Sequence, residues 1–396
     1  MLFRSRQLLQ WLAAAPLAGV SSRLIAAPGA GSRLLLVFLR GGYDATSLLV
    51  PHGSDFYYAA RPNIAIARPN SATDAALTLD SDWGLHPVLQ QSLYPLYQNR
   101  QLAFVPFAGS EDLSRSHFET QDSIELGQPL NGRRDFQSGF LNRLAGVLRG
   151  ERAIALTEQL PLIMRGEVQI ANQALRHVAK PALDARQVGL INAMYANTPL
   201  ARQVSDGFGV RDEIMRELAA EMDSASRNAA SSKGFEQEAR RIARLLQDKY
   251  SIGFVDIGGW DTHVGQGAAS GYLAGRLDEL GRGLAAFAEE MGNNWNNTVV
   301  VVISEFGRTF RENGNRGTDH GHGSVYWVLG GSIGGGRIVG EQMRIDRASL
   351  LQDRDLPVLN DYRTLLGGLL RRLYGLNAAQ CAQIFPATTP VDLGLL

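Results

Sequence analysis

The chain has 396 residues and a formal net charge of zero, with 39 Lys and Arg against 39 Asp and Glu. Because 45% of the residues are apolar and 20% are charged, the composition is that of a folded globular protein, and the lack of a basic excess argues against a nucleic-acid or anionic-membrane binder. The single cysteine, Cys381, excludes an intrachain disulfide framework and any multi-cysteine metal site, and no apolar run reaches the roughly 20 residues that span a bilayer.

Residues 1–27 are typical of a removable export signal. Arg4 and Arg6 make a basic start, an apolar stretch covers residues 8–20, and small residues follow over residues 24–27. The two arginines are separated by one residue, so the segment is a degraded version of a twin-arginine signal and leaves the Sec and twin-arginine routes open. The signal predicts an exported protein, periplasmic or extracellular; the alternative is an amphipathic first helix of the mature fold.

Five apolar segments of the remaining chain are too short for helices and are predicted to be buried strands. They cover residues 34–39, 102–107, 252–257, 298–303 and 325–329.

Helical patterns lie between these segments. An apolar stripe recurs at steps of three and four from Leu273 to Met291, and Asp361 is placed to cap a second helix that ends at Gly375. Strands that alternate with helices predict an α/β fold with a mostly parallel sheet flanked by helices on both faces. We expect residues 28–396 to form a single domain with a helical insertion near residues 170–250, which are polar and rich in helical patterns.

Polar residues collect at the ends of the predicted strands, where ligands bind in open parallel sheets. Clusters follow the first four strands and precede the fifth, and they hold four of the seven histidines. The clusters are Asp44, residues 110–119, residues 258–263, residues 304–309 and residues 317–323.

Carboxylates and imidazoles in these clusters suit metal-assisted hydrolysis, because a bound cation neutralises charge on a phosphoryl or sulfuryl oxygen. Asp261 and His263 lie two residues apart, so in an extended segment their side chains point the same way, and His320 and His322 share that spacing. The sequence therefore predicts a divalent metal as cofactor, with zinc, manganese, calcium and iron all open.

Each cluster also has a structural interpretation. Asp44 is compatible with a turn or an N-cap, and Ser116 begins a Ser-x-x-Glu capping box. Glu305 and Arg308 are spaced for an ordinary ion pair. Residues 319–322 lie on a glycine-rich loop for which a purely structural role fits less well.

Taken as a set and in this order, the motifs resemble those of the bacterial family called domain of unknown function 1501, over residues 33–386. That family in turn is similar to the alkaline phosphatase-like superfamily, which includes sulfatases and cofactor-independent phosphoglycerate mutases. The motifs are Leu39-Arg40-Gly41-Gly42-x-Asp44, Ser114-Arg115-Ser116-His117-Phe118-Glu119-x-Gln121-Asp122, Gly258-Gly259-Trp260-Asp261-Thr262-His263, Ser304-Glu305-Phe306-Gly307-Arg308-Thr309 and Gly317-Thr318-Asp319-His320-Gly321-His322-Gly323.

The resemblance implies an alkaline phosphatase-like fold and roles for individual residues. It makes Asp44 a metal ligand after the first strand and Ser116 the nucleophile at the start of a helix. It also places metal ligands after later strands, at Asp261, His263, Glu305, Asp319, His320 and His322. The superfamily usually has an Asp-His pair where this chain has Glu305-Phe306, and a wider Asp-to-His spacing than that of Asp261 and His263.

Two functional hypotheses follow. The first is an exported metal-dependent hydrolase of phosphate or sulfate esters, in which Arg115 or Arg308 steadies a small anionic ester or glycan substrate. The second is a secreted binding or assembly protein that retains the cleft without catalysis and binds a glycan or a partner protein. The departure at Glu305-Phe306 favours the second.

Overall fold

The computed structural model describes residues 31–173, 198, 230, 231 and 234–396. The predicted export signal lies outside these residues, as does most of the predicted insertion near residues 170–250. Within that insertion the structure describes one long helix, α8 (Phe235–Asp248).

All five predicted strand segments are strands, and they form the centre of one large sheet. Their side chains are buried almost throughout, as continuous apolar runs predict. They are β1 (Arg33–Leu39), β5 (Leu102–Gly109), β9 (Ile252–Gly258), β10 (Thr298–Ser304) and β11 (Ser324–Gly330).

The sheet is mixed but mostly parallel. Along its main path the order is β12-β5-β11-β10-β1-β9-β6-β7, with β13 paired to β5 and β8 paired to β9. The shorter strands are β6 (Ala153–Ala155), β7 (Ala171–Asn172), β8 (Ala230–Ser231), β12 (Arg337–Ile338) and β13 (Asn360–Asp361). A second, small antiparallel sheet contains β2 (Leu49–Val50), β4 (Gly84–Leu85) and β3 (Leu77–Thr78).

One reversed strand determines where the polar clusters meet. β11 runs antiparallel to both of its neighbours, β10 and β5, whereas β1 is parallel to β9 and β10. The carboxyl ends of β1, β5, β9 and β10 therefore share one edge of the sheet with the amino end of β11. For this reason the polar cluster of the fifth strand precedes it in sequence while the other four follow their strands.

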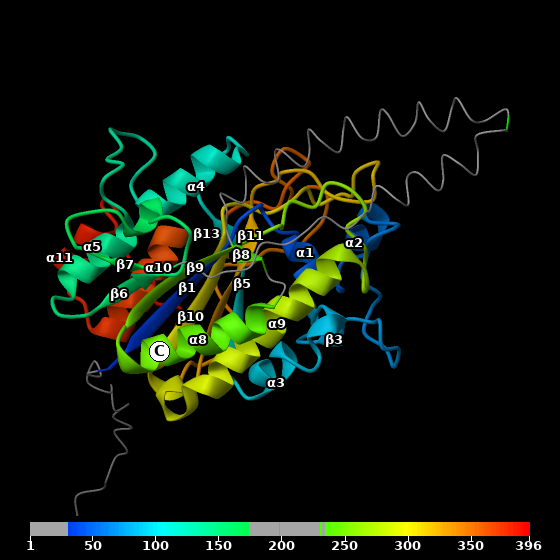
Figure 1. The fold of residues 1–396 in the computed structure, drawn as a ribbon. Helices are drawn as coiled ribbons and strands as arrows, with labels where there is room; N and C mark the ends of the chain where they lie inside the picture. Colours follow the sequence, from blue (N-terminus) through cyan, green and yellow to red (C-terminus); the bar gives the residue numbers. More distant parts are fainter. Residues whose placement is uncertain (1–30, 174–197, 199–229, 232–233) are drawn as a thin grey trace, which may run out of the picture.

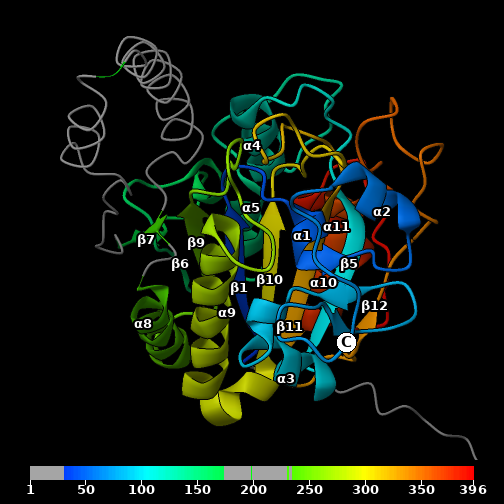
Figure 2. The ribbon, with the colours of Figure 1, turned by 90° about the vertical axis from the view of Figure 1, so that its right-hand side faces the viewer.

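Helices cover both faces of the sheet (Figure 1). Leu35, Val37 and Leu39 of β1 face a core that contains α8 and α9, and the alternate residues of β1 face a second core that contains α5, α10 and α11. Figure 2 shows α8 and α9 next to each other at the left of β1 and β10, and β10 pointing toward the end of the molecule at which α4 lies. The helices are α1 (Ala45–Leu48), α2 (Asp55–Ala60), α3 (Leu93–Gln98), α4 (His117–Leu126), α5 (Phe140–Val147), α9 (Tyr272–Met291), α10 (Tyr362–Tyr374) and α11 (Ala378–Ile384), with 3-10 turns at Pro87–Leu89, Leu162–Met164 and Gly292–Asn297.

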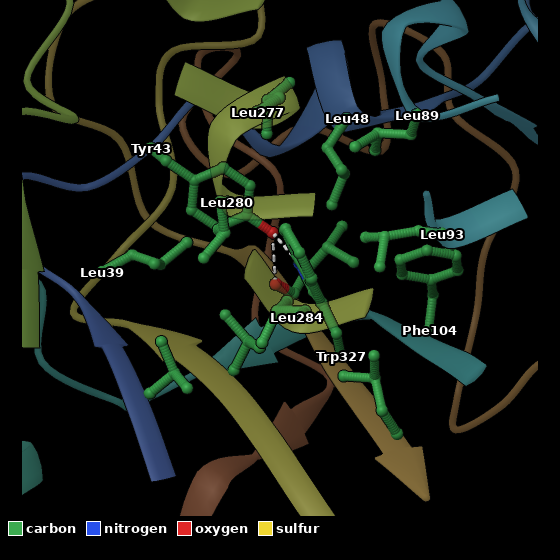
Figure 3. Close-up of a cluster of buried hydrophobic side chains, with 14 of the residues drawn as sticks. Leu39, Tyr43, Leu48, Leu89, Leu93, Phe104, Leu277, Leu280, Leu284 and Trp327 are labelled. Carbon is green, nitrogen blue, oxygen red and sulfur yellow. Dashed lines mark hydrogen bonds between the residues drawn. The ribbon is translucent and has the colours of Figure 1, made fainter. Parts of the chain in front are cut away.

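Both helices predicted from sequence are confirmed. The apolar stripe of α9 is buried against the sheet, where Leu277, Leu280 and Leu284 pack near Leu39 (Figure 3). In α10, the Asp361 side chain accepts hydrogen bonds from the first-turn backbone, and Gly375 ends the helix in the left-handed conformation that glycine adopts without strain.

The core beneath the carboxyl edge is aromatic and contains a buried hydrogen-bond chain. The indole Nε1 of Trp327 donates to the Tyr43 hydroxyl over 2.8 Å, and that hydroxyl donates to the carbonyl of Val325 over 2.5 Å (Figure 3). Burial raises the pKa of Tyr43 far above its usual range, so the hydroxyl remains a donor. This anchoring fixes the turn after β1, and with it the neighbouring Asp44. Among the described residues, no helix is both long and apolar enough to cross a membrane.

Candidate metal centre

Three imidazoles and one carboxylate converge at the carboxyl edge of the sheet. The Nε2 atom of His320 lies 3.0 Å from Nε2 of His117 and 3.1 Å from Nε2 of His263. One carboxylate oxygen of Asp261 lies 2.9 Å from Nε2 of His263 and 3.3 Å from Nε2 of His320, and the other lies 3.5 Å from Nε2 of His117. We call these four residues the imidazole cluster.

The four side chains of the imidazole cluster come from three separate segments of the chain. His117 is the first residue of α4, which starts there because the Ser116 side chain caps the backbone N–H of Glu119. Asp261 and His263 lie in the loop after β9. His320 lies before β11, where its backbone pairs with that of Arg308.

The second ring nitrogen of each histidine faces a group that only accepts hydrogen bonds. Nδ1 of His117 lies 2.8 Å from Glu305, Nδ1 of His263 lies 3.1 Å from Asp319, and Nδ1 of His320 lies 3.0 Å from the carbonyl oxygen of Arg115. These partners assign a proton to each Nδ1 atom, which leaves a lone pair on each Nε2 of a neutral ring. Metal-binding histidines have this arrangement, because the outer hydrogen bond fixes the tautomer.

Glu305 is buried behind His117. One of its oxygens accepts from the backbone of Gly41, the amide of Gln121 and Nδ1 of His117, each over 2.8 Å. Burial opposes ionisation of Glu305, but the contacts with His117 and Gln121 outweigh it and lower the pKa of the carboxyl to about 2. Burial likewise opposes protonation of His117, but its contacts with Asp261 and Glu305 outweigh burial and raise its pKa to about 9. Without a metal ion the ring therefore holds a second proton, on Nε2, which a bound cation would displace.

Arg308 lies beneath the cluster with all five N–H groups directed at acceptors within the protein. Nε and Nη2 donate to the carbonyls of Gly42 and Gly41, and Nη1 faces the carbonyl of Thr318 and Nε2 of His263. Nη2 also contacts the Asp261 carboxylate. Burial opposes ionisation of Asp261, but Arg308 and the three imidazoles outweigh burial and hold the pKa of this carboxyl far below its usual range. Contact of Arg308 with a substrate anion therefore requires the exchange of one of these bonds.

Asp44 lies in a separate buried cluster. Its two oxygens accept from Nη1 and Nη2 of Arg61 over 2.5 and 2.9 Å, and from the hydroxyls of Thr46 and Ser47. The amide of Gln266 adds a further bond of 2.6 Å. Burial opposes ionisation of Asp44, and Arg61 outweighs it, which keeps the pKa of Asp44 below its usual value. The structure thus gives Asp44 a guanidinium partner and records no contact between Asp44 and the imidazole cluster.

The other residues singled out from sequence lie around the cluster. Asp319 is half-exposed and holds His263, while the buried His322 turns its imidazole to the backbone of Asp112. Burial and Arg115 lower the pKa of His322 to about 4. Arg115 donates to Asp355 over 2.8 Å and to Gln352 over 2.7 Å, and the half-buried Ser116 hydroxyl serves the helix cap.

Sequence reasoning gave His117 no ligand role and did not single out Gln121, Arg61 or Gln266. His117 and Gln121 are spaced i, i+4 on α4, which places both on one helix face and is the signal that links them to one partner, Glu305. No local pattern marks Arg61 or Gln266, because their partners lie on other segments.

Comparison with known proteins identifies the family. The model of the family described as protein of unknown function (DUF1501) matches residues 31–385. The chain belongs to this family. As a DUF1501 member it carries the imidazole cluster within the matched residues, at His117, Asp261, His263 and His320. A comparison with curated protein sequences finds no match.

Solved structures show distant similarity to this DUF1501 protein. Ps i-CgsB in complex with k-i-k-neocarrahexaose is 10% identical with a TM-score of 0.42, over 88% of this chain and 74% of that chain. A 2-O GAG sulfatase is 11% identical with a TM-score of 0.40, over 91% and 73% of the two chains. A protein of the alkaline phosphatase superfamily from Vibrio parahaemolyticus is 9% identical with a TM-score of 0.35, over 76% and 60%.

Proposed function

We propose that this DUF1501 protein is an exported, metal-dependent hydrolase of phosphate or sulfate esters. The observation that carries the proposal is the convergence of imidazole lone pairs on one another and on the buried Asp261. Two neutral rings whose Nε2 atoms lie 3.0 Å apart repel each other unless a proton or a metal cation lies between them. His117, Asp261 and His320 are the group whose ligand atoms lie close enough to share one ion, and His263 adjoins them.

The charges around the cluster suit a divalent cation, which would take the place of the proton that His117 otherwise binds. Asp261, Glu305 and Asp319 all have a pKa below the usual carboxyl range, and Arg308 is the positive group in contact with one of them. With His117 neutral, as metal binding requires, three carboxylates against one guanidinium leave a charge of about −2, which one divalent cation balances.

A cation held there would supply charge neutralisation at a phosphoryl or sulfuryl oxygen. Glu305 and Asp319 keep the ligand imidazoles in the metal-binding tautomer, and Arg308 holds Asp261 in place. Ser116, next to His117 at the amino end of α4, is our candidate nucleophile, because a helix N-terminus stabilises developing negative charge. Arg115, whose side chain is about a quarter exposed (23%), is the candidate group to steady the substrate anion.

Elemental analysis of the purified mature protein tests the metal site, with His320→Ala and His322→Ala as a matched pair. Both variants remove an imidazole from the same loop, but only His320 belongs to the cluster. We expect about one equivalent of metal in the wild type and in His322→Ala, and its loss in His320→Ala. Metal-free wild type after reconstitution with zinc, manganese, calcium and iron would refute the hydrolase.

The catalytic role of Ser116 is tested separately. With phosphate and sulfate esters as substrates, Ser116→Ala is expected to abolish turnover while the metal content stays at the wild-type level. Unchanged turnover in this variant removes Ser116 from the mechanism and leaves the metal site standing.

A second candidate is a secreted binding or assembly protein without catalysis. The observation that favours it is Phe306, whose ring centroid lies 4.9 Å from that of His117 and 5.2 Å from that of His320. An apolar ring thus covers part of the cluster where an additional ligand would otherwise fit. Tight binding of a glycan or a protein, together with no turnover in a broad ester screen with metals supplied, would support this candidate.

A further inference from the structure

Gln266 connects the loops of the imidazole cluster to the Asp44 cluster. Its side chain is fully buried in the segment between His263 and α9. The amide oxygen accepts from the hydroxyls of Thr262 over 3.1 Å and Thr318 over 3.0 Å. The amide nitrogen donates to Asp44 over 2.6 Å.

The orientation of this amide is determined by its surroundings. Asp44 is held ionised and in place by Arg61, so it can only accept a hydrogen bond, and the NH2 group of Gln266 must face it. The amide oxygen therefore points away from Asp44, toward the two threonine hydroxyls. The planar amide of Gln266 is thus held at both ends, with its nitrogen as donor to Asp44 and its oxygen as acceptor from the two threonines.

Both threonines adjoin residues of the imidazole cluster. Thr262 stands between Asp261 and His263, and Thr318 precedes His320 by two residues. The backbone N–H of Thr318 also donates to the carbonyl of Thr262, and the carbonyl of Thr318 accepts from Arg308. Gln266 and this backbone bond together hold the loop after β9 against the loop before β11.

We propose that Gln266 is a positioning residue for the metal centre, which it serves by fixing Asp261 and His263 relative to His320. This inference rests on the proposed metal site. It also gives Asp44 an indirect role, as the buried anion that orients Gln266. Metal–ligand distances vary by only about 0.2 Å, so a small shift between the two loops is enough to weaken binding.

The test is zinc affinity, measured by competition with a chelator, for Gln266→Met in the full mature protein. Methionine has a similar length and volume but can replace none of these hydrogen bonds. Loss of a group hydrogen-bonded directly to a metal ligand typically weakens metal binding about 10- to 100-fold. Gln266 acts one contact further out, through the two threonines, so we expect the lower end of that range, about 10-fold. The matched control is Asn142→Leu, because Asn142 is another buried amide that joins two segments, through Met164 and Val168, away from the cluster. It is expected to lower the melting temperature with zinc affinity unchanged.

A second pair of variants separates positioning from stability. Thr262→Val and Thr318→Val each remove one hydroxyl that acts through Gln266. In the wild-type background each should weaken zinc binding by less than Gln266→Met does. In the Gln266→Met background each should raise the melting temperature, since an unpaired buried hydroxyl is removed, without restoring zinc affinity.

The outcomes distinguish this inference from the proposed function. If the wild type and Asn142→Leu bind zinc and Gln266→Met binds it equally well with only a lower melting temperature, the positioning role is refuted and the metal site stands. If the wild type itself binds no metal, the proposed function fails, and Gln266 is a purely structural amide.

Discussion

Asp44 and Asp261 occupy comparable places in this fold but have opposite surroundings. Each is a buried aspartate that follows a central strand, β1 or β9, at the same edge of the sheet. Asp44 is matched by a guanidinium that donates to both of its oxygens. Asp261 faces three imidazoles and shares Arg308 with four backbone carbonyls, and one of its oxygens has no hydrogen-bond partner among the described residues. The two aspartates thus differ in whether the carboxylate already has a dedicated guanidinium, and this difference makes Asp261 the candidate metal ligand of the two.

The largest expected effect comes from removing the guanidinium that neutralises Asp44. Arg61→Met leaves Asp44 buried and unpaired, and loss of one partner of a buried ion pair typically costs about 3–5 kcal/mol. Chemical denaturation should show that loss in the free energy of unfolding. A loss below about 1 kcal/mol would contradict our description of Asp44 as a residue that depends on its arginine.

A buried histidine that stays neutral, His86, lies within the electrostatic influence of Asp44. His86 bonds the carbonyl of Ala268 and caps the turn at Pro87, and burial lowers its pKa to about 4. A histidine whose pKa is lower in the folded state stabilises the fold above its unfolded pKa of about 6.5, and that stability is lost as pH falls toward 4.

His86→Asn keeps a capping side chain and removes this titration. Between pH 7 and pH 4 the wild type should lose about 3 kcal/mol more unfolding free energy than the variant. Parallel curves of unfolding free energy against pH for the two proteins would show that His86 is not the titrating group.

A smaller effect is expected in the imidazole cluster, when Glu305, the hydrogen-bond partner of Nδ1 of His117, is changed. Glu305→Gln replaces a carboxylate that can only accept with an amide that can donate to Nδ1, so the tautomer of His117 is no longer fixed. Zinc affinity should fall about 10- to 100-fold, as measured by competition with a chelator. Zinc affinity equal to the wild type would mean that Glu305 does not act through His117.

The smallest effect on stability and zinc binding concerns the start of α4. Ser116→Ala removes the N-cap and should lower the unfolding free energy by about 1 kcal/mol, with zinc affinity nearly unchanged, because the Ser116 hydroxyl is not part of the cluster. A large loss of zinc binding in this variant would show instead that the cap determines the position of His117.

Much of the candidate site was predictable because it depends on local patterns. Short apolar runs marked the five central strands, and histidines and carboxylates at their ends marked the edge where Asp261, His263 and His320 meet. His117 was harder to assign, because it stands in the same helix start as Ser116, where capping explains the local sequence equally well.

Sequence by itself therefore determined the strands, the two capped or striped helices and the set of residues at the functional edge. Tertiary structure alone decided which of those residues pair with which. His117 meets His320 across 203 residues, and Gln266 reaches Asp44 across 222, through the reversal of β11 and the order of the sheet. The physical reason is that a carboxylate binds whichever positive or donating group lies opposite it, and the choice between Arg61 and an imidazole is made only when distant segments pack together.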